Sequence, residues 1–253
     1  QEYNFNGKIY PVNPKGGIIE GLQAYTSVLE IPEEVDLAII VVNAKFVLST
    51  IDQCHEKGIK GLCIITAGFK ETGKEGAEAE KQLLAKVREY GMRCVGPNCL
   101  GVVNTHEDVR MDGCFAESLP ERGNIGFVSQ SGALGGGILN ILKDLNLGFA
   151  QFISIGNQAD VNAETALEYW ENEEDVEQIL LYMESIQNPA NFRKLASRIS
   201  KKKPILALKA GRSAAGASAA SSHTGSLAGA DKAANALLNQ SGVIREYSLQ
   251  DLF

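Results

Sequence analysis

Short apolar runs alternate with longer amphipathic segments along most of this chain. The run from Val35 to Val42 is mostly apolar and rich in β-branched residues, which is typical of a strand covered on both faces. The segment from Lys45 to Lys57 repeats its apolar positions with a helical period, and Gly58 behind it is a natural helix C-cap. The pattern therefore predicts a strand followed by a helix in this region.

The same alternation continues through both halves of the chain. In the first half it predicts strands at 61–66 and 92–95 around a helix at 76–90. In the second half it predicts strands and helices in turn, with strands at 125–129, 150–155, 176–183, 204–209 and 243–247 and helices at 132–147, 163–171 and 189–200. Strands that alternate with helices form right-handed crossovers and a parallel sheet. The predicted fold class is therefore α/β.

One loop-like stretch, from Thr105 to Arg122, interrupts this alternation and contains the Leu119–Pro120 step. We place a domain boundary there, which predicts one domain over residues 1–118 and a second over residues 119–253. A chain of 253 residues is long enough for two domains, and each half has enough elements for its own doubly wound parallel sheet.

Composition narrows the classes of protein that this chain can represent. The net charge of −7 argues against general nucleic-acid binding, which usually needs clustered basic residues. No apolar stretch is long enough to span a membrane, so no membrane partner is expected. The five cysteines include no CxxC pair, which indicates reduced thiols in a cytoplasmic protein and neither a disulfide framework nor a metal site. The abrupt start at Gln1 suggests a fragment.

Residues 129–132 (SQSG) form the first candidate site, because ligands of open parallel sheets bind beyond the carboxyl ends of the strands. Small residues between a strand and a helix let backbone N–H groups point at an anion, and the helix dipole adds favourable potential. Ser129, Ser131 and Gly132 are therefore candidate phosphate-binding residues. An ordinary tight turn remains the alternative on local features, whereas a nucleophile elbow would need glycine in place of Ser129.

The second candidate site is the loop at 210–229, in which 17 of 20 residues are Ala, Gly, Ser or Thr. A flexible linker has a similar composition. A linker, however, gains nothing from a single imidazole, and a helical pattern begins directly after the loop. A loop of small residues suits a group that must move between two partners, so His223 is a candidate catalytic residue. His55 and His106 lack such a setting and are interpreted as structural.

Two further predicted strands end in side chains that could take part in chemistry. Glu184 could accept the N–H of an imidazole and so fix its tautomer, although a surface glutamate is the alternative. Asn98 offers an amide donor and acceptor, and Cys99 lies where a thiol-bearing ligand could approach. A Gly–Pro turn with an Asx cap is the alternative for this second segment.

Four segments together resemble the α part of the NDP-forming acyl-CoA synthetases, the superfamily of succinyl-CoA synthetase. They are, in order, residues 10–15 (YPVNPK), 95–101 (VGPNCLG), 127–134 (FVSQSGAL) and 221–229 (SSHTGSLAG). The resemblance covers nearly the whole chain, and its most specific element is the Ser-His-Thr-Gly segment. It implies a Rossmann-like CoA-binding domain, truncated at its N-terminus, and a flavodoxin-like domain that carries the active-site histidine.

The resemblance also implies a reaction. In such enzymes phosphate attacks acyl-CoA, and the phosphoryl group of the acyl phosphate passes to the histidine and then to ADP, with Mg²⁺, in an ATP-grasp module. Carried over residue by residue, it implies that His223 is phosphorylated and that Glu184 orients it. It further implies phosphate contacts from Ser129, Ser131 and Gly132, and CoA-side contacts from Lys15, Asn98 and Cys99. Imidazole is a good leaving group, so the protein mainly has to position the phosphoryl group and screen its charge.

This chain departs from the family pattern in three places. The opening strand and Gly-rich turn that should hold the CoA phosphates are missing before Gln1. Asn43 stands where relatives usually have proline, so a CoA contact is not carried over to it. The ATP-grasp module is absent, so we expect an oligomer with an ATP-grasp subunit or module. The expected reaction interconverts acyl-CoA, ADP and phosphate with the acid, CoA and ATP, and acetyl is the family's common acyl group.

Two other functions compete with this interpretation. A regulatory module of a protein lysine acetyltransferase could use a similar region as an acyl-CoA or effector sensor, but a sensor has no need of a phosphorylatable histidine. A serine hydrolase could use Ser131, His223 and either Asp160 or Asp175, in an order that fits. The glycine that should precede such a nucleophile is lacking.

Overall fold

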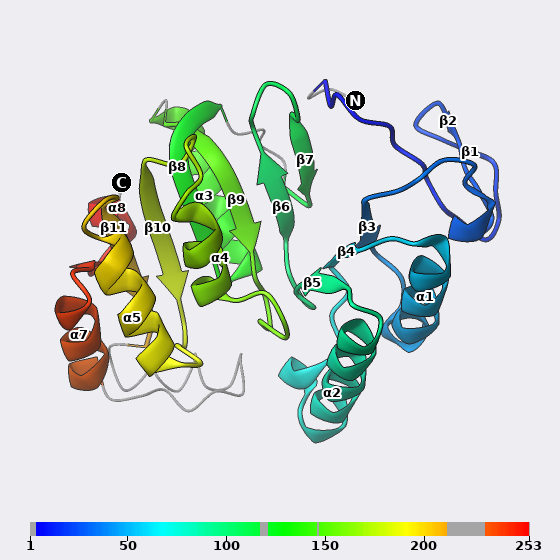
Figure 1. Ribbon diagram of the computed structural model, residues 1–253. Coiled ribbons are helices and arrows are strands. Elements are labelled where there is room, and N and C mark those ends of the chain that lie inside the picture. Colours follow the sequence, from blue (N-terminus) through cyan, green and yellow to red (C-terminus); the bar gives the residue numbers. More distant parts are fainter. Residues whose placement is uncertain (1–3, 117–120, 146, 212–230, 253) are drawn as a thin grey trace.

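The computed structural model describes residues 4–116, 121–145, 147–211 and 231–252, and the statements below concern these residues. They form a three-stranded sheet, a seven-stranded sheet and a small two-stranded ribbon (Figure 1). His223 and the rest of the predicted loop from residue 212 onward lie outside the described residues.

The first domain contains the three-stranded parallel sheet, in the order β3-β4-β5. Its elements are β1 (Ile18–Ile19), β2 (Leu22–Gln23), η1 (Val28–Glu30), β3 (Leu37–Ile40), α1 (Ala44–Lys57), β4 (Gly61–Ile64), η2 (Lys70–Thr72), α2 (Lys74–Glu89) and β5 (Arg93–Val95). Asn43 caps α1 by accepting the Lys45 N–H at 3.3 Å, and Gly58 ends the helix with a φ of 88°. Apolar residues of α1 and α2 share one core with the sheet.

The second domain is built on the seven-stranded sheet, in the order β12-β11-β10-β8-β9-β6-β7, and this sheet includes β6 and β7, which precede the predicted boundary in sequence. Its strands are β6 (Gly101–Asn104), β7 (Met111–Cys114), β8 (Arg122–Ser129), β9 (Phe149–Ser154), β10 (Gln178–Met183), β11 (Ile205–Lys209) and β12 (Ile244–Glu246). The five strands from β12 to β9 are parallel, whereas β6 pairs antiparallel with β9 and β7 antiparallel with β6.

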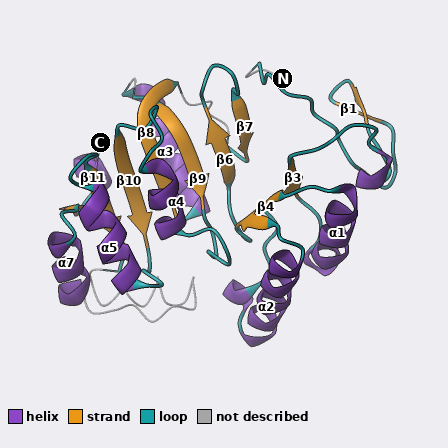
Figure 2. Cartoon of the chain, in the orientation of Figure 1, coloured by secondary structure: helices purple, strands orange, loops and turns teal. Residues whose placement is uncertain are grey.

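Helices cover both faces of this larger sheet (Figure 2). They are α3 (Gly132–Asp144), α4 (Ala163–Trp170), α5 (Pro189–Ile199), α7 (Asp231–Gln240) and the short α8 (Leu249–Leu252). Side chains of α4, α5 and α7 pack on one face around Trp170, and α3 and α8 pack on the other face around Phe127. The predicted fold class, two α/β domains with parallel sheets, is confirmed. None of the described helices has the length and apolar character needed to cross a bilayer.

The hairpin of β6 and β7 differs from the sequence prediction. The stretch from Thr105 to Arg122 was expected to be a loop, yet it contains β7, and β6 directly precedes it. The hairpin lies between the two sheets and extends the larger one (Figure 1). Its strands are short and carry no long apolar run, so their conformation depends on pairing with β9. The boundary between residues 118 and 119 remains a prediction.

Candidate functional site

The loop from β8 to α3 begins the candidate site at the carboxyl edge of the larger sheet. Ser129 is the last residue of β8, is fully buried, and its hydroxyl donates to the Ser131 carbonyl oxygen at 2.7 Å. Ser131 caps α3, because its hydroxyl oxygen accepts the Leu134 N–H at 3.4 Å. Gly132 opens the helix. The first turn of α3 therefore places backbone N–H groups at the helix N-terminus, a geometry that can bind an anion, and phosphate binding by Ser129, Ser131 and Gly132 stays a prediction.

Gln130, between the two serines, ties this loop to Glu184. Its side-chain oxygen accepts the N–H groups of Glu184 and Ser185 at 2.8 and 3.0 Å, and its Nε2 donates to the Ser185 hydroxyl at 3.1 Å. Gln130 is only 6% exposed. The sequence analysis did not single out Gln130, because a glutamine in a polar loop reveals its burial and its partner only in the folded chain.

Glu184 follows β10 directly, as predicted, and is half-buried. Since β10 is parallel to β8 and adjacent to it, both strand ends meet at one edge of the sheet. Glu184 and the start of α3 are therefore neighbours. The contact expected between Glu184 and His223 falls on the part of the chain that the structure does not describe.

Asn98 lies in a tight turn that follows β5. The Gly96–Pro97 peptide bond is cis, Asn98 has a φ of 58°, and its N–H donates to the Thr66 carbonyl at 3.0 Å. The side-chain Nδ2 of Asn98 donates to Oδ1 of Asn157 at 3.2 Å. The turn is thus held from both domains.

Cys99 follows Asn98, but its thiol points into the first domain. It is 6% exposed, donates to the Ile64 carbonyl at 3.3 Å and lies 3.8 Å from the sulfur of Cys63. The bond to Cys99 and burial raise the pKa of Cys63. Contact with a ligand at Cys99 would therefore come through its backbone.

Lys15 is exposed in a turn that begins at Asn13, whose side chain accepts the Lys15 N–H at 3.0 Å. Within the described residues, no hydrogen bond or ion pair joins Lys15 to Asn98 or Cys99. The structure thus brings Asn98 and the α3 loop together and leaves Lys15 as a separate surface cation.

Residues 154–161 of the second domain run along the turn that carries Asn98. Backbone N–H groups of Asn157 and Ala159 donate to the carbonyls of Pro97 and Gly96 at 2.9 and 3.1 Å. On the other side of the turn, a Cβ atom added to Gly132 would lie 3.6 Å from Cβ of Leu100. The turn after β5 therefore packs beside the N-terminus of α3.

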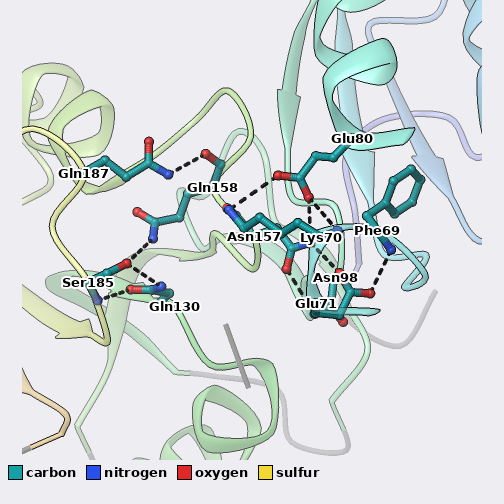
Figure 3. A network of polar contacts seen from close by, with 10 residues as sticks. All are labelled: Phe69, Lys70, Glu71, Glu80, Asn98, Gln130, Asn157, Gln158, Ser185 and Gln187. Atoms are coloured by element: carbon teal, nitrogen blue, oxygen red, sulfur yellow. Dashed lines mark hydrogen bonds and ion pairs between the residues drawn. The ribbon is translucent and has the colours of Figure 1, made fainter. Parts of the chain in front are cut away.

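Polar side chains surround Asn157 between the domains (Figure 3). Its Nδ2 donates to Glu71 at 2.6 Å and to Glu80 at 2.7 Å, and Nζ of Lys70 lies 3.4 Å from Glu80 and donates to the Asn157 carbonyl. Burial opposes ionisation of Glu71, but hydrogen bonds from Asn157 and from backbone N–H groups outweigh it, so the pKa of Glu71 is lowered. Both carboxylates thus act as acceptors that hold Asn157.

The described geometry does not favour the serine-hydrolase alternative. Asp160 accepts hydrogen bonds from Nε of Arg93 at 2.7 Å and from the Cys94 N–H at 3.0 Å. Asp175 precedes β10, at the opposite end of the sheet from Ser131, and lies 3.4 Å from Nε2 of His106. Neither aspartate is placed to orient a base beside Ser131.

Comparison with known proteins identifies both domains of the chain. Residues 122–253 match the family described as "Succinyl-CoA ligase like flavodoxin domain", and residues 1–105 match "CoA binding domain". Acetate–CoA ligase [ADP-forming] II subunit alpha of Pyrococcus furiosus is 47% identical over 252 residues, which are 100% of this chain and 54% of the relative. Acetate–CoA ligase [ADP-forming] of Methanocaldococcus jannaschii is 45% identical over 98% of this chain and 35% of its own.

A solved structure shares the fold. The dinucleotide-forming acetyl-coenzyme A synthetase 1 of Ca. Korarchaeum cryptofilum, in complex with phosphate and ADP, superposes with a TM-score of 0.93. It is 38% identical and covers 99% of this chain and 54% of its own. The chain thus spans between about a third and just over half of the length of these three relatives. On its sequence, its two domain matches and its fold, the chain belongs to the ADP-forming acyl-CoA synthetase branch of the succinyl-CoA ligase family.

Proposed function

We propose that this chain supplies the CoA-binding and phosphoryl-carrying part of an ADP-forming acyl-CoA synthetase, with acetyl as the first acyl group to test. The observation that carries the proposal is the packing of the Asn98 turn against the N-terminus of α3, beside Gly132. A thioester held at the turn and a phosphate held at the helix would lie side by side there. The ADP-forming acetate–CoA ligases among the relatives support this choice.

The proposed reaction has three steps. A phosphate oxygen attacks the thioester carbon, the C–S bond breaks, and CoA leaves as a thiol after taking a proton. An imidazole nitrogen of His223 then attacks phosphorus, the bond to the acyl oxygen breaks, and the carboxylate leaves. An oxygen of ADP finally takes the phosphoryl group from His223, which forms ATP and restores the imidazole.

Each candidate residue has a separate role in this scheme. Backbone N–H groups of Gly132 and the first turn of α3 hold the phosphate and screen its charge. Ser131 caps the helix, and Ser129 shapes the loop through its bond to the Ser131 carbonyl. Glu184 accepts the N–H of His223 and leaves the other ring nitrogen free to attack.

CoA would be bound by the first domain. The half-buried amide of Asn98 offers a donor and an acceptor near the thioester, the backbone of Cys99 continues the turn, and the exposed Lys15 can pair with a CoA phosphate. ADP and Mg²⁺ would be held by an ATP-grasp subunit or module, in an oligomer with this chain. We place the protein in the cytoplasm, because all five cysteines are free thiols.

The acyl-CoA sensor is the weaker candidate. Residues 222–225 retain the Ser-His-Thr-Gly segment, which a sensor would not need. The two curated relatives named above are ligases by name, and they match 100% and 98% of this chain.

The experiment that tests the proposal follows the phosphoryl group. The full-length protein, with its ATP-grasp subunit or module, is incubated with γ-labelled ATP and Mg²⁺ and compared with His223→Ala. The chain has three histidines, so His55→Ala and His106→Ala are matched controls. We expect acid-labile, base-stable label in the wild type and both controls, but not in His223→Ala. Label that persists in His223→Ala, or a wild type that takes none, would refute the proposal.

A further inference from the structure

Two sets of hydrogen bonds, joined by the backbone between Asn157 and Gln158, run from Glu80 of α2 in the first domain to Ser185 and Gln130 in the second (Figure 3). Gln130 extends them to the Glu184 N–H. Their centre is the segment Gly156–Gln158, which we call the Asn157 corner. Asn157 and Gln158 are adjacent in sequence and bond in opposite directions, one toward Asn98 and the other toward Ser185.

On the side of the first domain, every polar atom of the Asn157 amide is engaged. Oδ1 accepts from Asn98, and Nδ2 donates to Glu71 and Glu80. Asn157 is 6% exposed, and hydrogen bonds to carboxylates in such surroundings are stronger than neutral ones. The side chain of Asn98 is therefore held by a partner that is itself fixed on two sides.

On the side of the second domain, Gln158 reaches the loop that carries Glu184. Its Nε2 lies 3.4 Å from the Ser185 hydroxyl, and its carbonyl oxygen accepts Nε2 of Gln187 at 3.0 Å. The same Ser185 hydroxyl accepts from Gln130, whose oxygen holds the Glu184 N–H. The amide side chains of Gln130 and Gln158 thus both contact the Ser185 hydroxyl. This contact connects the Asn157 corner to the loop that carries Glu184 and to the loop that precedes α3.

We propose that the Asn157 corner is a positioning element that fixes the turn carrying Asn98 relative to the loop carrying Glu184. The inference rests on the proposed function, because it concerns the distance between the CoA side and the phosphoryl side of that site. Acyl and phosphoryl transfer require reacting atoms at about 3–3.5 Å, and a displacement of about 1 Å can slow such a step by about 100-fold. A corner bonded to both loops keeps that distance short in a site built from two domains.

The test separates the two half-reactions of the full-length protein with its ATP-grasp partner. In the first, γ-labelled ATP and Mg²⁺ label His223 without CoA or acid. In the second, saturating CoA and acetate discharge the label as inorganic phosphate, which is released when the CoA thiol displaces phosphate from the acyl phosphate. For Asn157→Ala we expect labelling within about twofold of wild type and discharge slowed by about 10- to 100-fold, as a loss of kcat.

Arg93→Gln is the matched control, because it also removes a contact between the domains. Arg93 bonds Asp160 across the boundary, whereas Asn98 bonds Asn157 and Gln130 bonds Ser185. We expect both half-reactions of Arg93→Gln to stay within about twofold of wild type. If it slowed discharge as much as Asn157→Ala, domain adhesion would explain the effect and the proposal would be wrong.

Two more variants keep the test decisive. Gln158→Asn retains an amide and a residue type that tolerates the φ of 57°, but it is too short to reach Ser185, so a smaller slowing of discharge is expected even if Asn157→Ala does not fold. Gln130→Met removes the acceptor for Glu184. If the corner couples the two loops, the fold-slowing of discharge in the double variant Gln158→Asn/Gln130→Met will be smaller than the product of the fold-slowings in the two single variants.

Strictly multiplicative effects, or unchanged discharge in Asn157→Ala and Gln158→Asn, would overturn the inference. A wild type that is never labelled would instead refute the proposed function, so the two failures are distinguishable.

Discussion

The α-carbon of Gly156 lies so close to Asn98 that a Cβ atom added to it would come 2.4 Å from the Asn98 carbonyl oxygen. Gly156 also has a φ of 49°, in the left-handed region that residues with a Cβ atom rarely adopt. Steric fit and backbone conformation therefore both require glycine at this contact. The two domains contact each other here through backbone atoms.

Gly156→Ala should accordingly destabilise the protein. The left-handed conformation alone amounts to about 1–2 kcal/mol for an L-residue, and relief of the clash would displace the Asn98 turn as well. Gly137→Ala is the control, since Gly137 is an exposed helical position with open space around it, and alanine there should stabilise by about 0.5–1 kcal/mol. Urea unfolding measures both changes, and equal shifts in the same direction would contradict this account.

Glu164→Gln should raise stability at neutral pH. Glu164 is buried in α4, and burial raises the pKa of its carboxyl group. Because the folded-state pKa lies above the unfolded one, the wild type loses stability as pH rises from the unfolded value through the folded value. Glutamine still accepts the Asn188 N–H, which Glu164 accepts at 3.3 Å, and it carries no charge to bury.

The measurement is the difference in unfolding free energy between Glu164→Gln and wild type as a function of pH. We expect that difference to be smallest below pH about 4, near the ordinary pKa of glutamate, and to grow as pH rises. A difference that is constant with pH would show that the carboxyl group does not titrate differently on folding.

Lys203→Met should destabilise the second domain by about 1–3 kcal/mol. Nζ of Lys203 donates to the carbonyls of Trp170 and Glu173 at 2.7 and 2.6 Å, and so satisfies backbone acceptors at the end of α4. Lys202→Met is the control, because the side chain of Lys202 makes an exposed 3.5 Å pair with Glu171, which is worth about 0–1 kcal/mol. Thermal unfolding of the two variants distinguishes them, and equal losses would contradict a role for the Lys203 contacts.

Glu184→Gln should slow phosphorylation of His223 by about 100-fold, if Glu184 orients the imidazole as proposed. The amide can no longer stabilise the imidazole as a carboxylate does, while the backbone bonds to Gln130 remain. Rapid-quench labelling with γ-labelled ATP measures the rate. Glu174→Gln, at an exposed position before β10, should label like wild type. Normal labelling of Glu184→Gln would remove Glu184 from the mechanism.

Much of the fold could be predicted from the sequence because its signals are local. The apolar run at 35–42 contains β3, and Gly58 ends α1 where the capping pattern places it, whereas the N-cap at Asn43 was not predicted. The positions of the parallel strands in the larger sheet follow the same logic, because a buried parallel strand must be apolar on both faces. The β6–β7 hairpin escaped prediction, since β6 pairs with β9, about 50 residues further along the chain.

Some features of the candidate site could likewise be predicted from the sequence, and others only the folded chain reveals. By itself the sequence determined the loops that end the strands, the serines and glycine that open α3, and the position of Glu184 behind β10, because backbone direction in a parallel sheet places every strand end at one edge. Only the tertiary structure decided that the Cys99 thiol turns inward and that Gln130, Asn157 and Gln158 join the two domains. Those outcomes depend on which buried polar groups meet across the boundary, and an amide side chain has no partner until both domains are folded.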